Sequence, residues 1–268
     1  MMSRCNARPL VSLHPPDSLL GMFLFPIRLR KVLESIYDSN MKKVLVVQSR
    51  TTPEMIEREQ KNFRRAIGAL ADITFLSALD ERLAWSTPDE FLEDIDGVIF
   101  GGSSDFDFNG GRAEKDPARI MSIIILSRTK SFVSYTLAEK IPLLGICYGH
   151  QLVANMYGGD VDHDESQSKF GAHEVCLSTD GMEDPLLKDL PERFLAQYAH
   201  KDSITKLPVG ATLLAGGSKC KFSALRYGDT AYTLQFHPEI ERLGTTEHGP
   251  ASPHASRIIP LWIERITA

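Results

Sequence analysis

The feature that most constrains the fold is an alternation of short, wholly apolar runs with longer amphipathic stretches. The first apolar run covers residues 44–47 (VLVV). Continuous β-branched runs are typical of strands buried on both faces of a parallel sheet, because crossover helices cover both faces. Pro53 then opens a stretch whose apolar residues share one helical face: Ile56, Phe63, Ile67 and Leu70. This order predicts βαβ units and a doubly wound, mostly parallel sheet flanked by helices.

The same pattern continues to residue 146 and then changes. Further apolar strands are predicted over 73–76, 95–100 and 141–146, with a long helix over about 117–139. The second half predicts mainly strands joined by turns, over 173–178, 193–199, 211–215, 221–227 and 231–236. Helical patterns there follow Cys147 and recur over 255–266, where Pro260 weakens the pattern. We therefore expect an α/β fold with added antiparallel strands in its C-terminal half.

Residues 1–40 differ from the rest of the chain. They hold five basic and three acidic residues, so a whole-chain net charge of −5 leaves −7 for the remainder. The apolar stretch 19–27 is broken by Pro26 and lacks a small-residue cleavage site, which argues against a signal peptide. We interpret 1–40 as an extension, with Met41 as an alternative natural start and 41–268 as one domain. A short helix over 31–38, packed on that domain, is the other interpretation.

Composition excludes several classes of function. With 43% hydrophobic and 24% charged residues, the chain is typical of a globular protein with a large core. Its mild acidity argues against a nucleic-acid surface, and it has no run of about 18 apolar residues that would span a membrane. The four cysteines form no C-x-x-C pair, and neither they nor the histidines have metal-ligand spacing. We expect a cytoplasmic protein without a metal or cofactor.

Only Cys147 stands in a context that indicates reactivity. It lies between an apolar strand and a helical stretch, in the segment Gly-Ile-Cys-Tyr-Gly over 145–149. This is the setting of a nucleophile elbow, with cysteine in place of serine, where the sharp turn requires small neighbours. The helix that follows favours the thiolate. For the motif taken alone, a buried strand–helix turn is the alternative interpretation.

Two further segments supply partners for a cysteine nucleophile. His237 and Glu239 follow a predicted strand, and residues two apart in extended chain point to the same side. Glu239 is thus able to orient the imidazole of His237 as a general base. Gly101 and Gly102 follow another predicted strand, so their exposed backbone N–H groups are able to form an oxyanion hole with that of Tyr148. An ordinary glycine-rich turn is the alternative interpretation of this segment taken alone.

Together these motifs resemble one family. GICYGHQ at 145–151, GG at 101–102 and QFHPE at 235–239 are similar to the motifs of class I (triad) glutamine amidotransferases. The resemblance extends over about 41–240. Lys169-Phe170-Gly171 and His200-x-Asp202 have a spacing similar to that of the glutaminase portion of GMP synthases.

The resemblance implies a reaction and a role for each motif residue. Cys147 attacks the side-chain amide of glutamine, His237 transfers the proton to the departing ammonia, and Glu239 orients His237. A γ-glutamyl thioester forms, and water hydrolyses it. Gly102 and Tyr148 hold the oxyanion through their N–H groups.

The substrate-binding residues implied by the resemblance are Gln151 and the segment 199–203, which includes Lys201 and Asp202. Gln151 contacts the glutamine, and the backbone of 199–203 receives the amino-acid end of the substrate. Two positions depart from the family: Lys201 replaces a glycine that many members have, and Gly-Gly-Ser over 101–103 replaces the commoner Gly-Gly-Pro.

The leading hypothesis is a glutaminase that supplies ammonia to a separate synthetase subunit, since the S-G-G-x-D-S pattern of an ATP pyrophosphatase is absent. Three alternatives remain at this stage. A free-standing γ-glutamyl hydrolase or peptidase would use the same triad. The intact triad disfavours a non-catalytic regulatory subunit, and the two-residue spacing of His237 and Glu239 disfavours an unrelated cysteine α/β-hydrolase.

Overall fold

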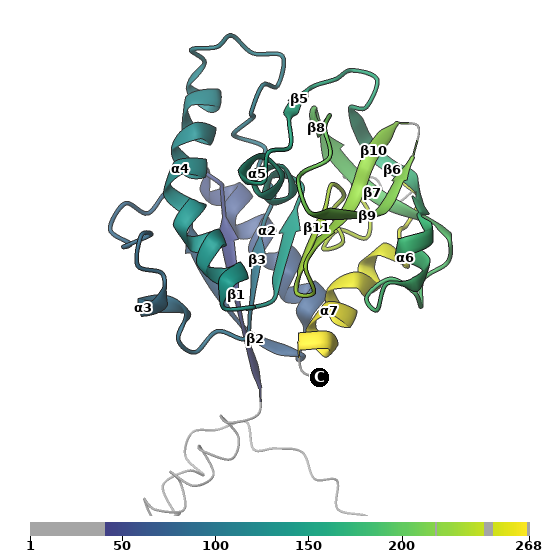
Figure 1. Cartoon of the computed structure of the whole chain (residues 1–268), viewed down its shortest axis with the longest axis horizontal. Helices are drawn as coiled ribbons and strands as arrows, with labels where there is room; N and C mark the ends of the chain where they lie inside the picture. Colours follow the sequence, from purple (N-terminus) through teal and green to yellow (C-terminus); the bar gives the residue numbers. More distant parts are fainter. Residues whose placement is uncertain (1–40, 218, 244–248, 267–268) are drawn as a thin grey trace, which may run out of the picture. The chain divides into compact units, whose positions relative to one another are not determined.

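Figure 1 shows the computed structural model, which describes residues 41–217, 219–243 and 249–266. The predicted extension over 1–40 lies outside the described residues. From Lys42 onward the described chain belongs to one compact unit. Its centre is a nine-stranded sheet in the order β2-β1-β3-β4-β11-β10-β9-β6-β7. Helices cover both faces of this sheet (Figure 1), so the expected α/β fold class is confirmed.

Five neighbouring strands form the parallel half of the sheet. They are β2 (Ala71–Ser77), β1 (Lys42–Gln48), β3 (Gly97–Phe100), β4 (Leu143–Ile146) and β11 (Ala231–Leu234). The first four correspond to strands predicted from apolar runs, whereas β11 falls within the strand predicted over 231–236 among the turn-linked strands of the second half. β4 begins two residues later than expected, after Pro142, which has no N–H to donate to a strand ladder.

The other half of the sheet is antiparallel, as predicted. It contains β10 (Cys220–Tyr227), β9 (Ala211–Gly217), β6 (Lys169–Leu177) and β7 (Arg193–His200). A separate small sheet pairs β5 (Val161–His163) with β8 (Asp202–Ile204). This small sheet was not predicted, because three-residue strands are too short to show a period-two pattern.

The helices divide between the two faces of the sheet. α2 (Pro53–Ile67) and α7 (Ile258–Ile266, after a 3₁₀ turn over Ala255–Arg257) contribute to one core. α4 (Pro117–Ala138) and α5 (Tyr148–Met156) contribute to the other, while α3 (Asp89–Leu92) and α6 (Thr179–Glu183) are short. Alternate residues of β1 serve opposite faces: Val44 and Val46 join the first core, and Leu45 and Val47 the second.

Two local expectations were wrong. Leu70 is not on the inner face of α2, because the helix ends at Ile67 and the chain turns at Gly68, whose φ is 58°. Pro260 does not weaken α7. It lies in the first turn, where a backbone N–H has no intrahelical acceptor, so the proline costs no helix hydrogen bond there.

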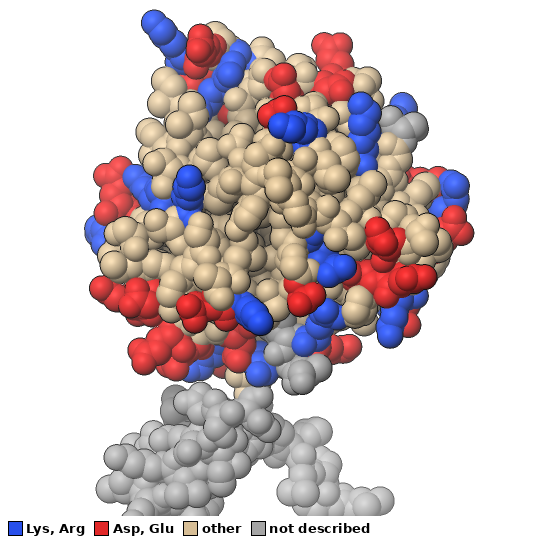
Figure 2. Space-filling model, viewed as in Figure 1, with Lys and Arg blue, Asp and Glu red and all other residues tan. Residues whose placement is uncertain are grey.

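The face of the molecule shown in Figure 2 has a mixed charge distribution. Basic and acidic side chains alternate around its rim, and its centre is largely uncharged. No continuous basic stripe of the kind that follows a nucleic-acid backbone crosses this face. Within the described ranges, no helix combines the length and the apolar character needed to cross a membrane.

Phe132 of α4 tests the second core. Its side chain is fully buried, and its ring lies 5.7 Å from the rings of Trp85, Phe91 and Phe100. We expect Phe132→Ala to lower the free energy of unfolding by about 3–5 kcal/mol in urea denaturation. Ile123→Ala, at an exposed position of the same helix, is the matched control with an expected change below about 0.5 kcal/mol. Equal effects of the two substitutions would contradict this account of the core.

Candidate active site

The predicted site residues follow three adjacent parallel strands. Gly102 lies two residues beyond the end of β3, Cys147 directly follows β4, and His237 comes three residues after β11. β4 pairs with both neighbours, so the three chain segments leave the sheet side by side. The carboxyl edge of a parallel sheet is where α/β proteins place their ligands.

Cys147 has the backbone geometry of a nucleophile elbow. Its φ of 51° and ψ of −98° lie in a region that non-glycine residues rarely adopt. Its N–H donates to the carbonyl of Leu234 at 2.7 Å, which links the turn to β11. A Cβ at Gly149 would lie 2.4 Å from the carbonyl oxygen of Phe100, and one at Gly145 would lie 3.0 Å from Gly149. The close packing explains why glycine flanks the cysteine.

The two N–H groups predicted to stabilise an oxyanion are next to this cysteine, and neither has an acceptor among the described residues. Tyr148 is the first residue of α5, so its N–H has no acceptor within the helix. The N–H of Gly102 has no hydrogen-bond partner in the described part of the chain. A Cβ at Gly102 would lie 2.9 Å from Cε1 of His237 and 3.5 Å from Cβ of Cys147. Gly102 therefore contacts both of these residues.

His237 and Glu239 form a buried pair. Nδ1 of His237 lies 2.6 Å from Oε1 of Glu239, and their side chains are 6% and 2% exposed. Burial by itself lowers the pKa of His237, but the carboxylate of Glu239 and the sulfur of Cys147 outweigh it and raise that pKa to about 10. The imidazole is therefore protonated at neutral pH, a state that stabilises a nearby thiolate.

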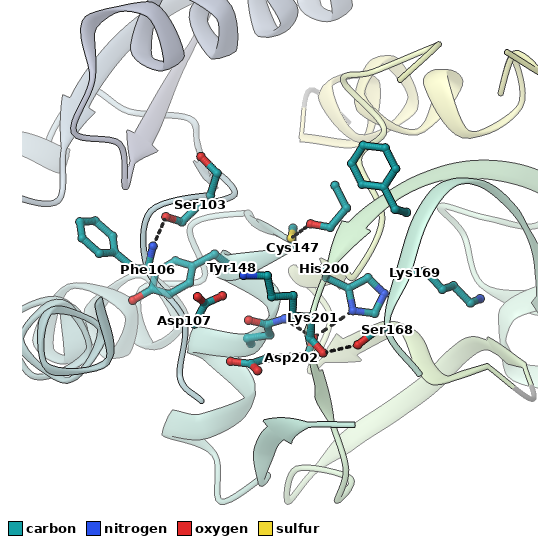
Figure 3. Close-up of a pocket in the computed structure, with 14 residues that line it drawn as sticks. Ser103, Phe106, Asp107, Cys147, Tyr148, Ser168, Lys169, His200, Lys201 and Asp202 are labelled. Carbon is teal, nitrogen blue, oxygen red and sulfur yellow. Dashed lines mark hydrogen bonds between the residues drawn. The ribbon is translucent and has the colours of Figure 1, made fainter. Parts of the chain in front are cut away.

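A cavity of about 480 Å³ opens beside Cys147 (Figure 3). Its lining includes Phe106 from the loop after β3, Ser168 from the segment before β6, and Phe170 from β6. The thiol of Cys147 lies 3.8 Å from the carbonyl oxygen of Ala199, which also lines the cavity. The nucleophile candidate is thus accessible from a space that a small molecule can occupy.

The three residues expected to bind substrate all line this cavity, with different contacts. Gln151 is buried, and its Nε2 donates to the carbonyl of Asp202 at 2.7 Å. Lys201 is exposed. The carboxylate of Asp202 accepts the N–H groups of Asn109 and Gly110 at 2.7 and 2.6 Å. The Asp202 side chain therefore anchors the loop over 105–112.

A buried ion pair supports the predicted oxyanion loop and was not anticipated. Arg50 follows β1 and binds Oε1 of Glu59 through Nη2 at 3.0 Å and Nε at 3.2 Å. Gln48 donates to the other oxygen of Glu59 at 2.8 Å, and Arg50 also donates to Ser104 at 2.9 Å. A Cβ at Gly101 would lie 3.0 Å from Glu59. The pair therefore packs directly against the Gly101–Ser104 segment.

The position of Glu59 within the predicted helix could have indicated its burial, but the sequence analysis considered only the apolar residues of that helix. Glu59 lies between Ile56 and Phe63 at helical spacings of three and four, on the buried face of α2. Burial raises the pKa of its carboxyl group, while Arg50 and Gln48 oppose that rise. An acid on an apolar helix face is expected to have a buried partner.

Within the described ranges, no group of three or more histidine, cysteine, aspartate or glutamate side chains is arranged to hold a metal ion.

Comparison with known proteins places the chain in a family. Residues 110–252 match the family described as glutamine amidotransferase class-I. The chain is 35% identical over 125 residues to one subunit of the glutamine-hydrolyzing GMP synthase of Methanocaldococcus jannaschii, a match that covers 46% of this chain and 63% of that protein. It is 30% identical to the corresponding Archaeoglobus fulgidus protein, over 58% of this chain and 72% of that protein.

A solved structure supports the same fold. The crystal structure of a candidate GMP synthase subunit from Thermoplasma acidophilum superimposes with a TM-score of 0.62 and 21% identity, over 85% of this chain and 95% of that one. Fold and site together define an α/β protein with a cysteine at a nucleophile elbow beside a buried His–Glu pair. The chain belongs to the class I glutamine amidotransferase family.

The raised pKa of His237 predicts a pH dependence of stability. Because the folded-state pKa of about 10 exceeds the ordinary value of 6.5, this histidine stabilises the fold fully below pH 6.5. That contribution is lost as the pH rises through about 10. We expect the difference in unfolding free energy between wild type and His237→Gln to shrink over this window, measured by urea denaturation at each pH.

Glu239→Gln is the matched control for the pH experiment. It removes the carboxylate that raises the pKa of His237, so the pH dependence should move to lower pH. The assignment of a protonated imidazole would be contradicted if the difference in unfolding free energy between wild type and His237→Gln stayed constant between pH 6.5 and 10.

Removal of Glu59 tests the buried ion pair. Glu59→Ala leaves Arg50 buried without its carboxylate partner, and we expect a loss of about 3–5 kcal/mol in the free energy of unfolding. The control is Glu174→Ala, whose side chain pairs with Arg193 on the surface and is 54% exposed. That substitution should cost at most about 1 kcal/mol in the same denaturation assay. Similar losses in the two variants would show that the Arg50–Glu59 pair has no special role.

Proposed function

We propose that this chain hydrolyses the side-chain amide of glutamine through Cys147 and supplies the ammonia to a separate acceptor-modifying protein. The observation that carries the proposal is the 2.6 Å contact between buried His237 and Glu239, next to a cysteine at a strand–helix elbow. Such a set is the arrangement that activates a cysteine nucleophile. Family membership supports glutamine as the source of the amide.

The geometry supports a two-step reaction. The Cys147 thiolate attacks the amide carbon, forming a C–S bond, and the oxyanion accepts N–H bonds from Gly102 and Tyr148. His237, held by Glu239, donates its proton to the leaving nitrogen as the C–N bond breaks, which releases ammonia and leaves a γ-glutamyl thioester. His237 then removes a proton from water as that water attacks the thioester. Glutamate leaves, and the Cys147 thiolate is restored.

The relatives bear on the acceptor. The two archaeal relatives described above are each one subunit of a glutamine-hydrolyzing GMP synthase, which supports the proposal that a second protein uses the ammonia. The match spans 63% of the length of the Methanocaldococcus jannaschii protein. We propose that the partner of this chain is a separate synthetase, with glutamine as the substrate of the chain itself.

One observation favours a second candidate function. The cavity of about 480 Å³ lies within the range that holds drug-sized ligands, about 300–1,000 Å³. By volume it admits a γ-glutamyl dipeptide as well as glutamine. A γ-glutamyl hydrolase would use the same three catalytic residues with no partner protein.

Ammonia release from glutamine by the full chain tests the proposal. Cys147→Ala removes the nucleophile, and we expect kcat to fall at least about 10³-fold, measured with an enzyme-coupled ammonia assay. Cys176→Ala is the matched control, because this second free cysteine lies outside the cavity. Faster hydrolysis of γ-glutamyl dipeptides than of glutamine would favour the second candidate. Turnover of neither substrate, with or without a GMP synthase-type synthetase, would overturn both.

A further inference from the structure

A second cavity lies where β6 separates from β9. β6 pairs with β7 over residues 169–176, but with β9 only at Cys176 and Leu177. The sheet is therefore open between the N-terminal part of β6 and the turn that follows β9, and a cavity of about 400 Å³ occupies this opening. A Cβ at Gly217 in its lining would meet no other atom within 4 Å. We call this space the β6–β9 cavity; Cys147 is not part of its lining.

The ionised side chains of the β6–β9 cavity are mainly basic. Lys169, Arg193 and Lys219 are accompanied by one acid, Glu174, so the formal net charge is +2. Nη1 of Arg193 donates to Oε1 of Glu174 at 2.9 Å, and these two side chains are 62% and 54% exposed. This pair neutralises itself at the surface. The two lysines are left without a carboxylate partner among the described residues.

Lys169 is the buried member of this group. It is 8% exposed, and its amine lies 4.4 Å from the centre of the Tyr198 ring. No carboxylate or hydrogen-bond acceptor contacts that amine within the described ranges. In Figure 3 the side chain points away from Cys147, although Lys169 lines both cavities. All three donors of a buried ammonium are thus available to a ligand in the β6–β9 cavity.

The pKa of Lys169 reflects the missing counter-ion. Burial lowers this pKa; the sulfur of Cys220 opposes the shift, and the positive charge of Lys219 adds to it. Two neighbouring cations, one of them buried, raise the free energy of the fold unless an anion joins them. An anion bound between the two lysines would supply the missing partner.

The charge of the cavity matches that of a phosphate group. A phosphate monoester carries a charge of about −1.5 to −2 at neutral pH, and its terminal oxygens accept hydrogen bonds from several directions. A single carboxylate would neutralise only half of the +2 charge. We propose that the β6–β9 cavity is a binding site for a phosphate group, free or carried by a small ester, with Lys169 as its buried anchor and Arg193 and Lys219 at its rim. This site is separate from the proposed hydrolysis and does not depend on it.

Cys176 provides a probe at the same place. Its thiol lines the β6–β9 cavity and is partly exposed, with Oε1 of Glu174 3.6 Å from its sulfur. A phosphate group held by Lys169 and Arg193 would cover this thiol and add negative charge beside it. Both effects slow alkylation, because the thiolate is the reactive form and neighbouring negative charge disfavours it.

Calorimetry and maleimide labelling of the full chain test the site. Inorganic phosphate, glycerol phosphate and acetate would be titrated at constant ionic strength, and the labelled fraction of Cys176 would be read by peptide mass. We expect saturable binding of phosphate or its ester, at least about tenfold tighter than binding of acetate, with matching protection of Cys176. The tighter of the two phosphate ligands identifies the source of the group.

Lys169→Met tests the buried anchor, because it keeps the length of the side chain and removes its charge. We expect the Kd for phosphate to rise at least about tenfold and the protection of Cys176 to be lost. Lys130→Met, at an exposed position of α4, is the matched control and should change neither. Lys219→Gln is a second variant, at an exposed position where no folding defect is expected, and should raise the Kd about two- to fivefold.

Removal of the acid should act in the opposite direction. Glu174→Gln frees Arg193 and takes away the one carboxylate among the described lining residues, so we expect phosphate to bind about two- to fivefold tighter. The proposal would be overturned by the absence of saturable phosphate binding, by acetate binding as tightly as phosphate, or by equal Kd values in wild type and Lys169→Met. Labelling of Cys176 that is unaffected at saturating phosphate would overturn it as well.

Discussion

The arrangement of this site depends on the parallel pairing of β4 with β3 on one side and β11 on the other. The register places Phe100 opposite Gly145 and Leu234 opposite Ile146, so all three strands end at the same level of the sheet. Each chain segment then carries its candidate site residue away from the same edge. Gly102, Cys147 and His237 meet because of this register, although the last two are ninety positions apart in the sequence.

The close approach of these segments strains the backbone and buries charged groups, and the surrounding structure offsets the free energy that this costs. Cys147 holds a strained backbone, and the adjacent glycines leave no room for a side chain. Two buried charged pairs, Arg50 with Glu59 and His237 with Glu239, lie around the same edge. Buried charges of this kind contribute defined geometry more than net stability, since desolvation opposes their attraction. The two apolar cores on the faces of the sheet provide the compensating stability.

Much of the fold followed from local pattern. Apolar runs indicated four of the five parallel strands, and the helical spacing of Phe63 and Ile67 indicated α2. β11 was predicted as a strand, but among those of the antiparallel half. β5, β8 and α6 were not predicted, because they are three to five residues long and lie outside the apolar runs and periodic stretches from which the other elements were predicted. The position of β11 was also beyond local pattern: it leaves an antiparallel hairpin with β10 and returns to the middle of the sheet beside β4. That placement depends on long-range pairing.

In the candidate site, too, some features follow from local sequence and others depend on long-range contacts. The sequence by itself determined the residue types and short spacings: a cysteine between two glycines at a strand–helix junction, and a glutamate two residues after a histidine. Those features are local, because a sharp turn and an extended tripeptide constrain only their own neighbours. Only the tertiary structure decided that Glu59 packs against the predicted oxyanion loop and that Asp202 anchors the loop carrying Asp107. Both are contacts between segments distant in the sequence, and the burial that gives each carboxylate its role exists only once the sheet is assembled.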